Sequence, residues 1–401
     1  MTPAVVIFWS ALALLAYVYL GYPALAWLRR QIASRPVARA PVEPTVTVVV
    51  VAFNEGERIA RRIDNLLRSD YPSDRLAIVV GSDGSTDDTV ERASAYGEQG
   101  VRVREFPQRR GKAAVLNELI RSARGEIVVL ADARQRFEAG AIRALVANFA
   151  DPGVGAVSGE LHLRKRSGTA PAGEGAGLYW RYEKFIRASE SASGSTVGAT
   201  GAIYAIRRRL FEPIPADTIL DDVLIPVQMI GKGYRVVFDP EARAHDLISM
   251  TATDDFVRKC RTIAGTFQLF ARHPWLLNPR RSPVWFTALS HKAMRLAIPA
   301  LHAAILVSNA YLLDEVFYRG LFAGQVIFYA AAMAGCGQVR LDRDCAGRAH
   351  RARIVLTVPY TICLLGWATI VGLGRFVARR QRVTWERIPG EPGPRVASRP
   401  V

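Results

Sequence analysis

The run TVTVVVVA at residues 45–52 decides the fold of this chain. All but one of its side chains are β-branched, and five consecutive apolar residues end it. Such a continuous run is typical of a strand that is buried on both faces of a sheet. Apolar residues then recur at helical spacing, at Ile59, Ile63, Leu66 and Leu67. The strand and the helix after it predict the start of an α/β domain.

Three more strands are expected further along the chain. They are LAIVVGSD at 76–83, VRVREF at 101–106 and EIVVLAD at 126–132, with helical stretches between them. Strand and helix in repeated alternation predict an α/β domain with a mostly parallel sheet, which we place at residues 45–250. In such sheets ligands bind beyond the carboxyl ends of the strands, so the polar residues that end each apolar run are the candidates for function.

The first segment of the chain is long enough to cross a membrane. Residues 1–28 carry no charged side chain, and about 20 apolar residues span a bilayer. A cleaved signal peptide would have basic residues before a shorter apolar run. Here the basic residues follow it, in a linker at 29–44. The positive-inside rule therefore predicts a transmembrane helix, followed by an α/β domain that lies in the cytosol.

Residues 293–378 contain three more candidate spans, at 296–313, 320–339 and 354–374. Arginines crowd both the loop before the third span and a basic tail at 379–401, so both are expected in the cytosol. One full span between loop and tail would place them on opposite sides. This conflict stays open, and a re-entrant or interfacial segment among the three would resolve it. We expect a multi-pass protein of the cell (inner) membrane.

Residues 251–292 join the α/β domain to these spans and have the pattern of amphipathic helices. Phe256, Ile263 and Phe267 stand there among arginines and lysines. Basic amphipathic helices usually lie in the membrane interface. An ordinary surface helix of the α/β domain is the alternative, and the closeness of the spans favours the interface.

The overall charge indicates a membrane partner rather than a nucleic acid. The 401 residues hold 53 Lys and Arg against 36 Asp and Glu, a formal net charge of +17. These basic residues concentrate beside the uncharged runs, as the cytosolic flanks of spans do. The four cysteines and six histidines show no metal-binding spacing, so we expect neither a zinc site nor a disulfide framework.

Polar residues end three of the predicted strands. The runs end in AFNE at 52–55, SDGSTDD at 82–88 and ADAR at 131–134. Asp83 suits a turn whose carboxylate accepts hydrogen bonds from a base or a ribose, although such tripeptides are also common turns. Asp132 is more informative, because a lone carboxylate beside buried residues is costly unless it is paired or bound to a metal.

Seven motifs follow one another along the α/β domain and the segment after it. They are VVVAFNEGERI (49–59), VVGSDGSTDDT (79–89), RRGKAAVLN (109–117), LADARQRF (130–137), GATGAIYAIRR (198–208), LDDVLIPVQMIGKGYRVVFDPEARA (220–244) and RKCRTIAG (258–265). In this order they resemble the motifs of family 2 glycosyltransferases with the nucleotide-sugar-binding GT-A fold. The resemblance covers nearly the whole α/β domain and is strongest to the membrane-embedded synthases of cellulose, chitin, hyaluronan and poly-N-acetylglucosamine.

For the donor, the resemblance implies that Asp83 binds the uracil or ribose side of a nucleotide-sugar. The same pocket would be lined by Ala52, Asn54 and Glu55, with Lys112 near the nucleotide.

For the metal, Asp132 stands where the family's first DxD carboxylate contacts a divalent ion, Mg or Mn, and the donor diphosphate. Arg134 replaces the second carboxylate, and an arginine can itself neutralise phosphate charge. Either metal dependence is weakened, or Asp132 holds the ion together with water and phosphate oxygens. Arg134 itself either contacts the donor or points outward into solvent.

For the chemistry, Asp221 and Asp222 match the family's acidic pair, whose second member is the catalytic base. Displacement by an acceptor hydroxyl needs a carboxylate to take the proton, and Asp221 would raise the pKa of that base. A helix N-cap is the alternative role for Asp221. Gly201, in GATGA at 198–202, lacks a side chain and would let an acceptor sugar approach the backbone.

Arg258 and Arg261 match part of the family's Gln-x-x-Arg-Trp motif, which supports the diphosphate and the acceptor. Three residues apart on a helix, they share a face that suits a diphosphate clamp. Thr262 replaces the tryptophan that would stack on an acceptor sugar.

We therefore expect an inverting glycosyltransferase that uses a UDP-sugar to build a cell-surface or extracellular polysaccharide. Single-sugar transfer to a lipid or a polyprenyl phosphate is the second hypothesis, motivated by Thr262. A non-catalytic membrane scaffold or transporter is the third, motivated by Arg134.

Overall fold

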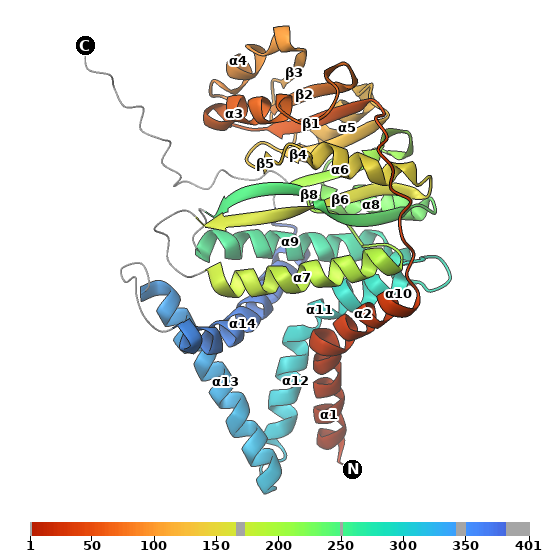
Figure 1. The fold of residues 1–401 in the computed structure, drawn as a ribbon. Helices are drawn as coiled ribbons and strands as arrows, with labels where there is room; N and C mark the ends of the chain where they lie inside the picture. The colour runs from red at the N-terminus through yellow and green to blue at the C-terminus, as the bar shows by residue number, and fades with distance from the viewer. Residues whose placement is uncertain (1, 166–172, 249–251, 342–349, 382–401) are drawn as a thin grey trace, which may run out of the picture.

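The computed structural model describes residues 2–165, 173–248, 252–341 and 350–381. Most of the predicted tail at 379–401 and much of the basic loop before the last predicted span lie outside these residues. Figure 1 shows a sheet domain, two long helices beneath it, and apolar helices that project away below them.

The four predicted strands are present within an eight-stranded sheet. They are β1 (Val46–Ala52), β2 (Leu76–Asp83), β3 (Val101–Phe106) and β4 (Ile127–Asp132). The remaining strands are β5 (Arg136–Phe137), β6 (Val154–Lys165), β7 (Ile203–Arg207) and β8 (Arg235–Ile248). Their order across the sheet is β3-β2-β1-β4-β7-β6-β8-β5.

The sheet is mostly parallel, as predicted, with antiparallel neighbours on one side. β1 pairs in parallel with β2 and β4, β2 pairs so with β3, and β6 with β8. β7 runs antiparallel to both β4 and β6, and β5 runs antiparallel to β8. Because β1, β2 and β4 run in the same direction, their carboxyl ends meet at one edge of the sheet.

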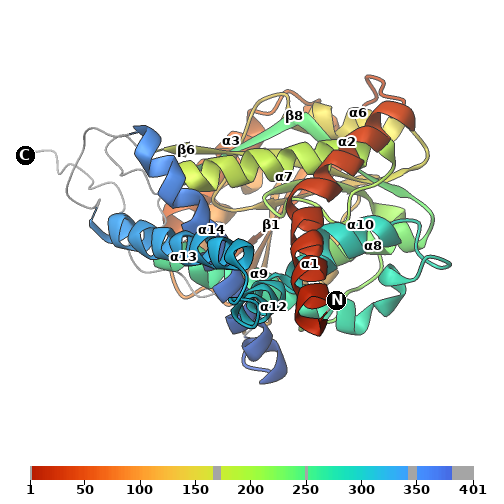
Figure 2. The same cartoon turned by 90° about the horizontal axis from the view of Figure 1, so that it is seen from below.

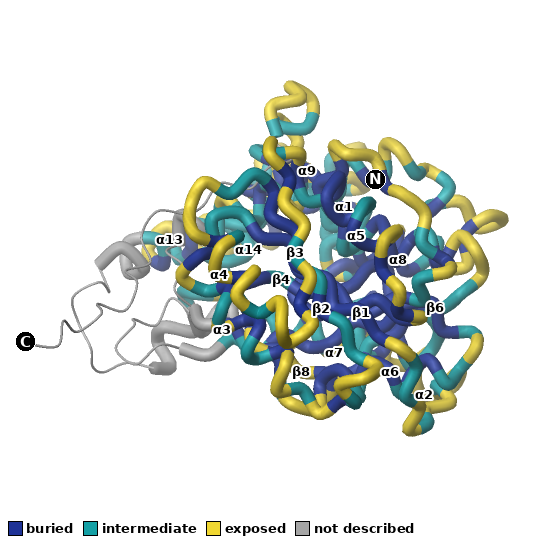
Figure 3. The backbone as a smooth tube through the Cα atoms, turned by 90° about the horizontal axis from the view of Figure 1, so that it is seen from above, coloured by how far each residue is buried: buried dark blue, intermediate teal, exposed yellow. Residues whose placement is uncertain are grey.

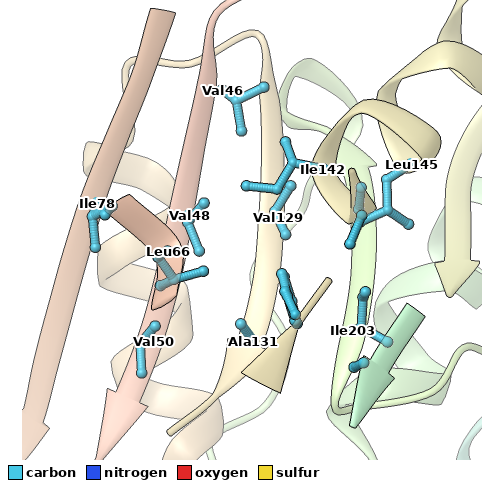
Figure 4. Packing of buried hydrophobic residues seen from close by; sticks show 14 of the residues in the cluster. Val46, Val48, Val50, Leu66, Ile78, Val129, Ala131, Ile142, Leu145 and Ile203 are labelled. Atoms are coloured by element: carbon cyan, nitrogen blue, oxygen red, sulfur yellow. The ribbon is translucent and has the colours of Figure 1, made fainter. Parts of the chain in front are cut away.

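Helices cover both faces of the sheet, which explains the continuous apolar run in β1. Val48 and Val50 pack toward α3 (Gly56–Leu67) and α6 (Ala141–Ala147) (Figure 4). Val49 and Val51 pack toward α5 (Lys112–Ser122) and α8 (Asp221–Gly231). The short α4 (Thr89–Ser94) lies beside β3. Figure 3 shows the central strands buried and the loops at their ends exposed.

Two long helices, α7 (Gly173–Ser193) and α9 (Ala252–Arg272), lie beneath the sheet (Figure 1). α9 falls in the segment with the amphipathic pattern, and it packs on α14 (His350–Val377). The ring of Phe267 in α9 stacks on that of Phe376 in α14, with centroids 6.0 Å apart. α7 packs on α2 (Tyr22–Ile32), where Ile186 contacts Tyr22 and Ala26. The sheet domain is therefore connected to the apolar helices through α7 and α9, which pack directly on them.

Three helices are long and apolar enough to cross a membrane in the described part of the chain. The first is Pro3–Ile32, which is made up of α1 (Pro3–Ala16), a π-helical turn (η1, Tyr17–Gly21) and α2. The second is Val316–Cys336, within α13 (Val316–Leu341), and the third is Leu356–Val377, within α14. Figure 2 shows α1, α12 and α13 from below, projecting from the domain.

A fourth apolar unit is broken. Trp285–Leu296, which comprises α10 (Trp285–Thr287), the π-helix η7 (Ala288–Ala293) and α11 (Met294–Leu296), meets α12 (Ile298–Ala310) at 57°. Pro299, near the start of α12, has no backbone N–H and cannot continue the hydrogen-bond ladder, which accounts for the break. The predicted span at 296–313 is thus a shorter helix of 13 residues after a bend.

Candidate functional site

A cavity of about 970 Å³ lies at the carboxyl end of β4 and continues down to the apolar helices. Its upper wall holds Asp132 at the end of β4, Lys112 at the start of α5, and Asp221 at the start of α8. Its lower wall includes Ile298 of α12 and Leu365 of α14. One space therefore joins the sheet edge to helices that are apolar enough to span a bilayer.

Lys112 links two acidic positions of the upper wall. Its Nζ lies 2.9 Å from Oδ1 of Asp132 and 3.4 Å from Oδ2 of Asp221. Burial alone lowers the pKa of Lys112, but the charges of Asp132 and Asp221 outweigh it and raise that pKa above its usual range. The lysine is therefore a permanent cation between two carboxylates.

Asp222 has the environment of a general base. Its Oδ2 accepts a hydrogen bond of 3.1 Å from the backbone N–H of Gly201. Burial and the neighbouring charge of Asp221 raise the pKa of Asp222 to about 6. A carboxylate with this pKa is mostly ionised at neutral pH and is basic enough to accept a proton from a hydroxyl during reaction.

Arg134 is neither free in solvent nor directed only at the cavity. Its Nη2 donates to Oδ2 of Asp246 in β8 at 2.6 Å, and Gln135 donates to the same oxygen at 3.0 Å. Both Arg134 and Gln135 still line the cavity. Asp246 was missed at the level of sequence, because its partner lies 112 positions away and nothing in the local pattern marks the pair.

Asp83, Asn54 and Ala52 hold loops together behind the cavity lining. The carboxylate of Asp83 is buried and accepts hydrogen bonds from the backbone N–H groups of Arg110 and Gly111. Asn54, at φ 53°, accepts a hydrogen bond from the backbone N–H of Thr86. Ala52 is fully buried in the core. Their expected contacts with a donor stay predictions.

Phe53 and Glu55 do line the cavity beside these loops. The guanidinium of Arg109 lies 3.7 Å from the centroid of the Phe53 ring, and Glu55 pairs with Arg58 at 2.9 Å. The loop that Asp83 anchors therefore brings an arginine and an aromatic ring to one side of the site.

Arg258, Arg261 and Thr262 bring α9 to the cavity wall. Arg258 is 3.3 Å from Asp255, and Arg261 donates to the carbonyl oxygen of Ile219 at 3.4 Å. The described lining holds nine Lys and Arg side chains against five Asp and Glu. This surplus of positive charge suits an anionic ligand such as a diphosphate.

The structure thus brings most of the predicted site residues around one cavity and leaves three outside its lining. The lining includes Glu55, Lys112, Asp132, Arg134, Gly201, Asp221, Asp222, Arg258 and Arg261, and leaves out Ala52, Asn54 and Asp83.

Several charged residues of the lower wall were not predicted. α7 supplies Glu183 and Arg187, and the broken apolar unit supplies His291, Lys292 and Arg295. A signal was present, because basic residues interrupt an apolar segment in SHKAMRLA at 290–297. Charged residues at membrane depth are usually functional or paired.

Residues 47–214 match the family model described as "Glycosyl transferase family 2". This match identifies residues 47–214 as a glycosyltransferase family 2 domain, and the sheet that they contribute to has the GT-A-like fold. An enzyme is therefore favoured over the non-catalytic scaffold.

Two curated relatives are similar to this chain in sequence. Poly-beta-1,6-N-acetyl-D-glucosamine synthase of Staphylococcus aureus (strain COL) is 25% identical over 235 residues, which are 57% of this chain and 56% of that one. The synthase of the same description from Staphylococcus epidermidis is 21% identical over 297 residues, 71% of this chain and 70% of that one. The chain spans little more than half the length of the first of these relatives.

A solved structure supports the fold. A mannosyltransferase from Pyrobaculum calidifontis, in complex with GDP-Man and Mn²⁺, superposes with a TM-score of 0.69 at 23% identity. The match covers 93% of this chain and 99% of that one, so the similarity includes the helices outside the sheet domain.

Proposed function

We propose that this chain is a membrane-embedded inverting glycosyltransferase that acts in the synthesis of a cell-surface polysaccharide. It takes a sugar from a UDP-sugar in the cytosol and adds it to an acceptor at the membrane. The observation that carries the proposal is the single cavity that joins Asp132, Asp221 and Asp222 to the apolar helices. Similarity to poly-N-acetylglucosamine synthases supports a polysaccharide product.

The reaction follows from the residues around Asp222. An acceptor hydroxyl attacks the anomeric carbon of the donor while the bond from that carbon to the diphosphate oxygen breaks. Asp222 takes the hydroxyl proton, because its carboxylate is ionised above a pKa of about 6. The electron pair of the broken bond leaves with the diphosphate. Lys112, Arg258 and Arg261 supply positive charge for this leaving group.

A divalent metal fits the site through a single carboxylate. No cluster of three or more His, Cys, Asp or Glu that could hold a metal occurs in the described residues. Asp132 is part-exposed on the cavity wall, and ions such as Mg²⁺ are often bound by one carboxylate with water and substrate phosphates. Asp132 would hold the ion, which when bound would neutralise charge on the diphosphate. Arg134 lines the same wall where the second carboxylate is missing, but its guanidinium is paired with Asp246.

Single-sugar transfer to a lipid is the second candidate. Two observations favour it over polymerisation: Thr262 stands on the cavity wall in place of a stacking aromatic ring, and the lower cavity is lined by apolar side chains of α12 and α14.

A screen of UDP-sugars with the full chain in membranes tests both candidates. Release of UDP, with a product analysed by mass, identifies the donor. A ladder of products separated by one sugar supports polymerisation, whereas one product that carries one added sugar supports single transfer. Absence of turnover with every nucleotide-sugar would count against the proposed function.

A further inference from the structure

The lower wall of the cavity holds two cations that form no salt bridge with a carboxylate of the described residues. Lys292 lies in η7, and no described residue makes a hydrogen bond or an ion pair with its ammonium group. Arg187 in α7 donates to the hydroxyl of Thr200 at 2.7 Å, a neutral partner, and no carboxylate of the described chain pairs with it. Both side chains are partly buried and line the same space.

The nearby carboxylates are already occupied. Glu183 accepts hydrogen bonds from Arg295 and from Nε2 of His291. Glu190 binds Nδ1 of His291 at 2.7 Å and the hydroxyl of Tyr22 at 2.6 Å. Burial alone raises the pKa of Glu183, but the charges of Arg295 and His291 outweigh it and hold that pKa well below its usual range. Both acids are thus bound to other groups, and they attract Lys292 only from beyond salt-bridge distance. Arg187 likewise interacts with Asp222 without a salt bridge.

Arg187 and Lys292 repel each other across this partly buried wall, and an anion bound between them would offset that repulsion. The wall below them is apolar, with Leu296, Ile298, Val358, Ile362 and Leu365 along the cavity. The cavity therefore presents a cationic zone beside an apolar zone. A ligand that matches both has a phosphate headgroup and a hydrocarbon chain.

The cationic zone is connected to the candidate base. Arg187 binds Thr200, and the next residue, Gly201, donates its backbone N–H to Asp222. A phosphate held by Arg187 would thus lie beside the loop that faces the base. A sugar attached to that phosphate could then present its hydroxyl to Asp222.

We propose that Arg187 and Lys292 bind the phosphate of a lipid-linked saccharide acceptor, whose hydrocarbon chain lies along α12 and α14. The proposal rests on the proposed function and gives that function its acceptor class. The phosphate belongs to the acceptor, while the donor diphosphate occupies the upper wall near Lys112 and Arg258. The covalent step stays the one described above.

The test uses the full chain in lipid nanodiscs with the donor found by the screen. Two acceptors are compared: a polyprenyl-phosphate-linked saccharide and the same saccharide without lipid or phosphate. The variants are Lys292→Gln and Arg187→Gln. Lys184→Gln, which removes a charge on α7 from an ion pair with Glu160, is the matched control.

We expect the first two variants to raise the KM for the lipid-linked acceptor roughly tenfold, the loss expected for one charge-assisted contact. Donor hydrolysis without acceptor and the KM for the donor should stay within twofold, and Lys184→Gln should resemble the wild type. A raised donor KM would assign these cations to the donor and overturn the proposal. An equal effect on both acceptors would overturn it too.

A direct binding measurement separates the sources of phosphate. Native mass spectrometry of the wild type should retain a polyprenyl phosphate, and Lys292→Gln should lose it. Equal retention of an ordinary anionic phospholipid, or displacement by inorganic phosphate alone, would contradict a lipid-acceptor site. If the wild type turns over and Lys292→Gln has the same KM for the lipid-linked acceptor, this inference is wrong, while the proposed function is still supported. If the protein retains the polyprenyl phosphate but turns over no nucleotide-sugar, the proposed function is contradicted.

Discussion

The Nζ of Lys112 lies 2.9 Å from a carboxylate oxygen of Asp132, and the same nitrogen lies 3.4 Å from Asp221. The lysine therefore joins the end of β4, at Asp132, to the start of α8, which carries the acidic pair. Because this cation lies near both carboxylates, it offsets the repulsion between them.

Lys112→Met should damage both stability and activity. The side chains of Lys112 and Asp221 are only 16% and 9% exposed, so the substitution leaves a partly buried charge without its partner. We expect a loss of about 2–4 kcal/mol in the free energy of unfolding and loss of donor binding. Thermal unfolding and nucleotide binding measure the two effects. Lys232→Met, which breaks a partly exposed pair with Glu212, should leave donor binding unchanged.

Asp222→Asn should lower kcat roughly 10²–10⁴-fold while donor binding persists. The asparagine oxygen can still accept the hydrogen bond from Gly201, so the loop keeps its position. Because a partly buried charge beside Asp221 is removed, the melting temperature should rise slightly. Asp217→Asn, which loses only a surface pair with Arg272, is the matched control and should turn over at the wild-type rate.

The pH profile should report on Asp222. Burial and Asp221 raise the pKa of Asp222 to about 6, and the base works only when it is deprotonated. The rate constant kcat/KM should therefore rise with pH through about 6 and then level off. In Asp221→Asn one cause of the raised pKa is gone, so this acidic limb should move to lower pH. An unmoved limb in that variant would assign the titration to another group.

Gly201→Ala tests the spacing around the base. A Cβ at position 201 would lie 3.0 Å from Oδ2 of Asp222 and 3.3 Å from its Cγ. The carboxylate must then shift, and displacement of a catalytic group by a fraction of an ångström lowers kcat roughly tenfold or more. Gly194→Ala is the control, because a Cβ there meets nothing within 4 Å. Similar kinetics for the two variants would show that the contact is unimportant.

Arg134→Ala should mainly affect folding. The substitution leaves the buried carboxylate of Asp246 with Gln135 as its remaining side-chain partner. We expect a loss of about 1–2 kcal/mol, discounted because Arg134 is 30% exposed. Chemical denaturation measures this loss. A wild-type midpoint together with a weakened donor affinity would instead favour a direct donor contact.

Sequence patterns predicted four of the eight strands, because their apolar residues form short runs that end in polar residues, and β5 to β8 were not predicted. The four predicted strands agree with β1 to β4 within one residue. Patterns of this kind depend only on neighbours in the chain. The motifs likewise marked Asp132, Asp221 and Asp222, which the fold brings to one cavity.

Side-chain pairs between residues far apart in the sequence cannot be predicted from such local patterns. Asp246 meets Arg134 across 112 positions, and His291 meets Glu183 across 108. A re-entrant segment among the three spans was one expectation, but the bend at Pro299 was not located, because the apolar composition of 296–313 continues through it. Composition indicates how long an apolar segment is, whereas the position of a break in its helix depends on the backbone hydrogen bonds.

Donor turnover in matched membranes of the wild type and Asp222→Asn tests the central claim most directly. With the nucleotide-sugar found by the screen, the wild type should release one nucleoside diphosphate for each sugar added to acceptor. Asp222→Asn should bind the same donor and release almost none. Equal sugar transfer by the two proteins would contradict the assignment of Asp222 as the base of this cavity.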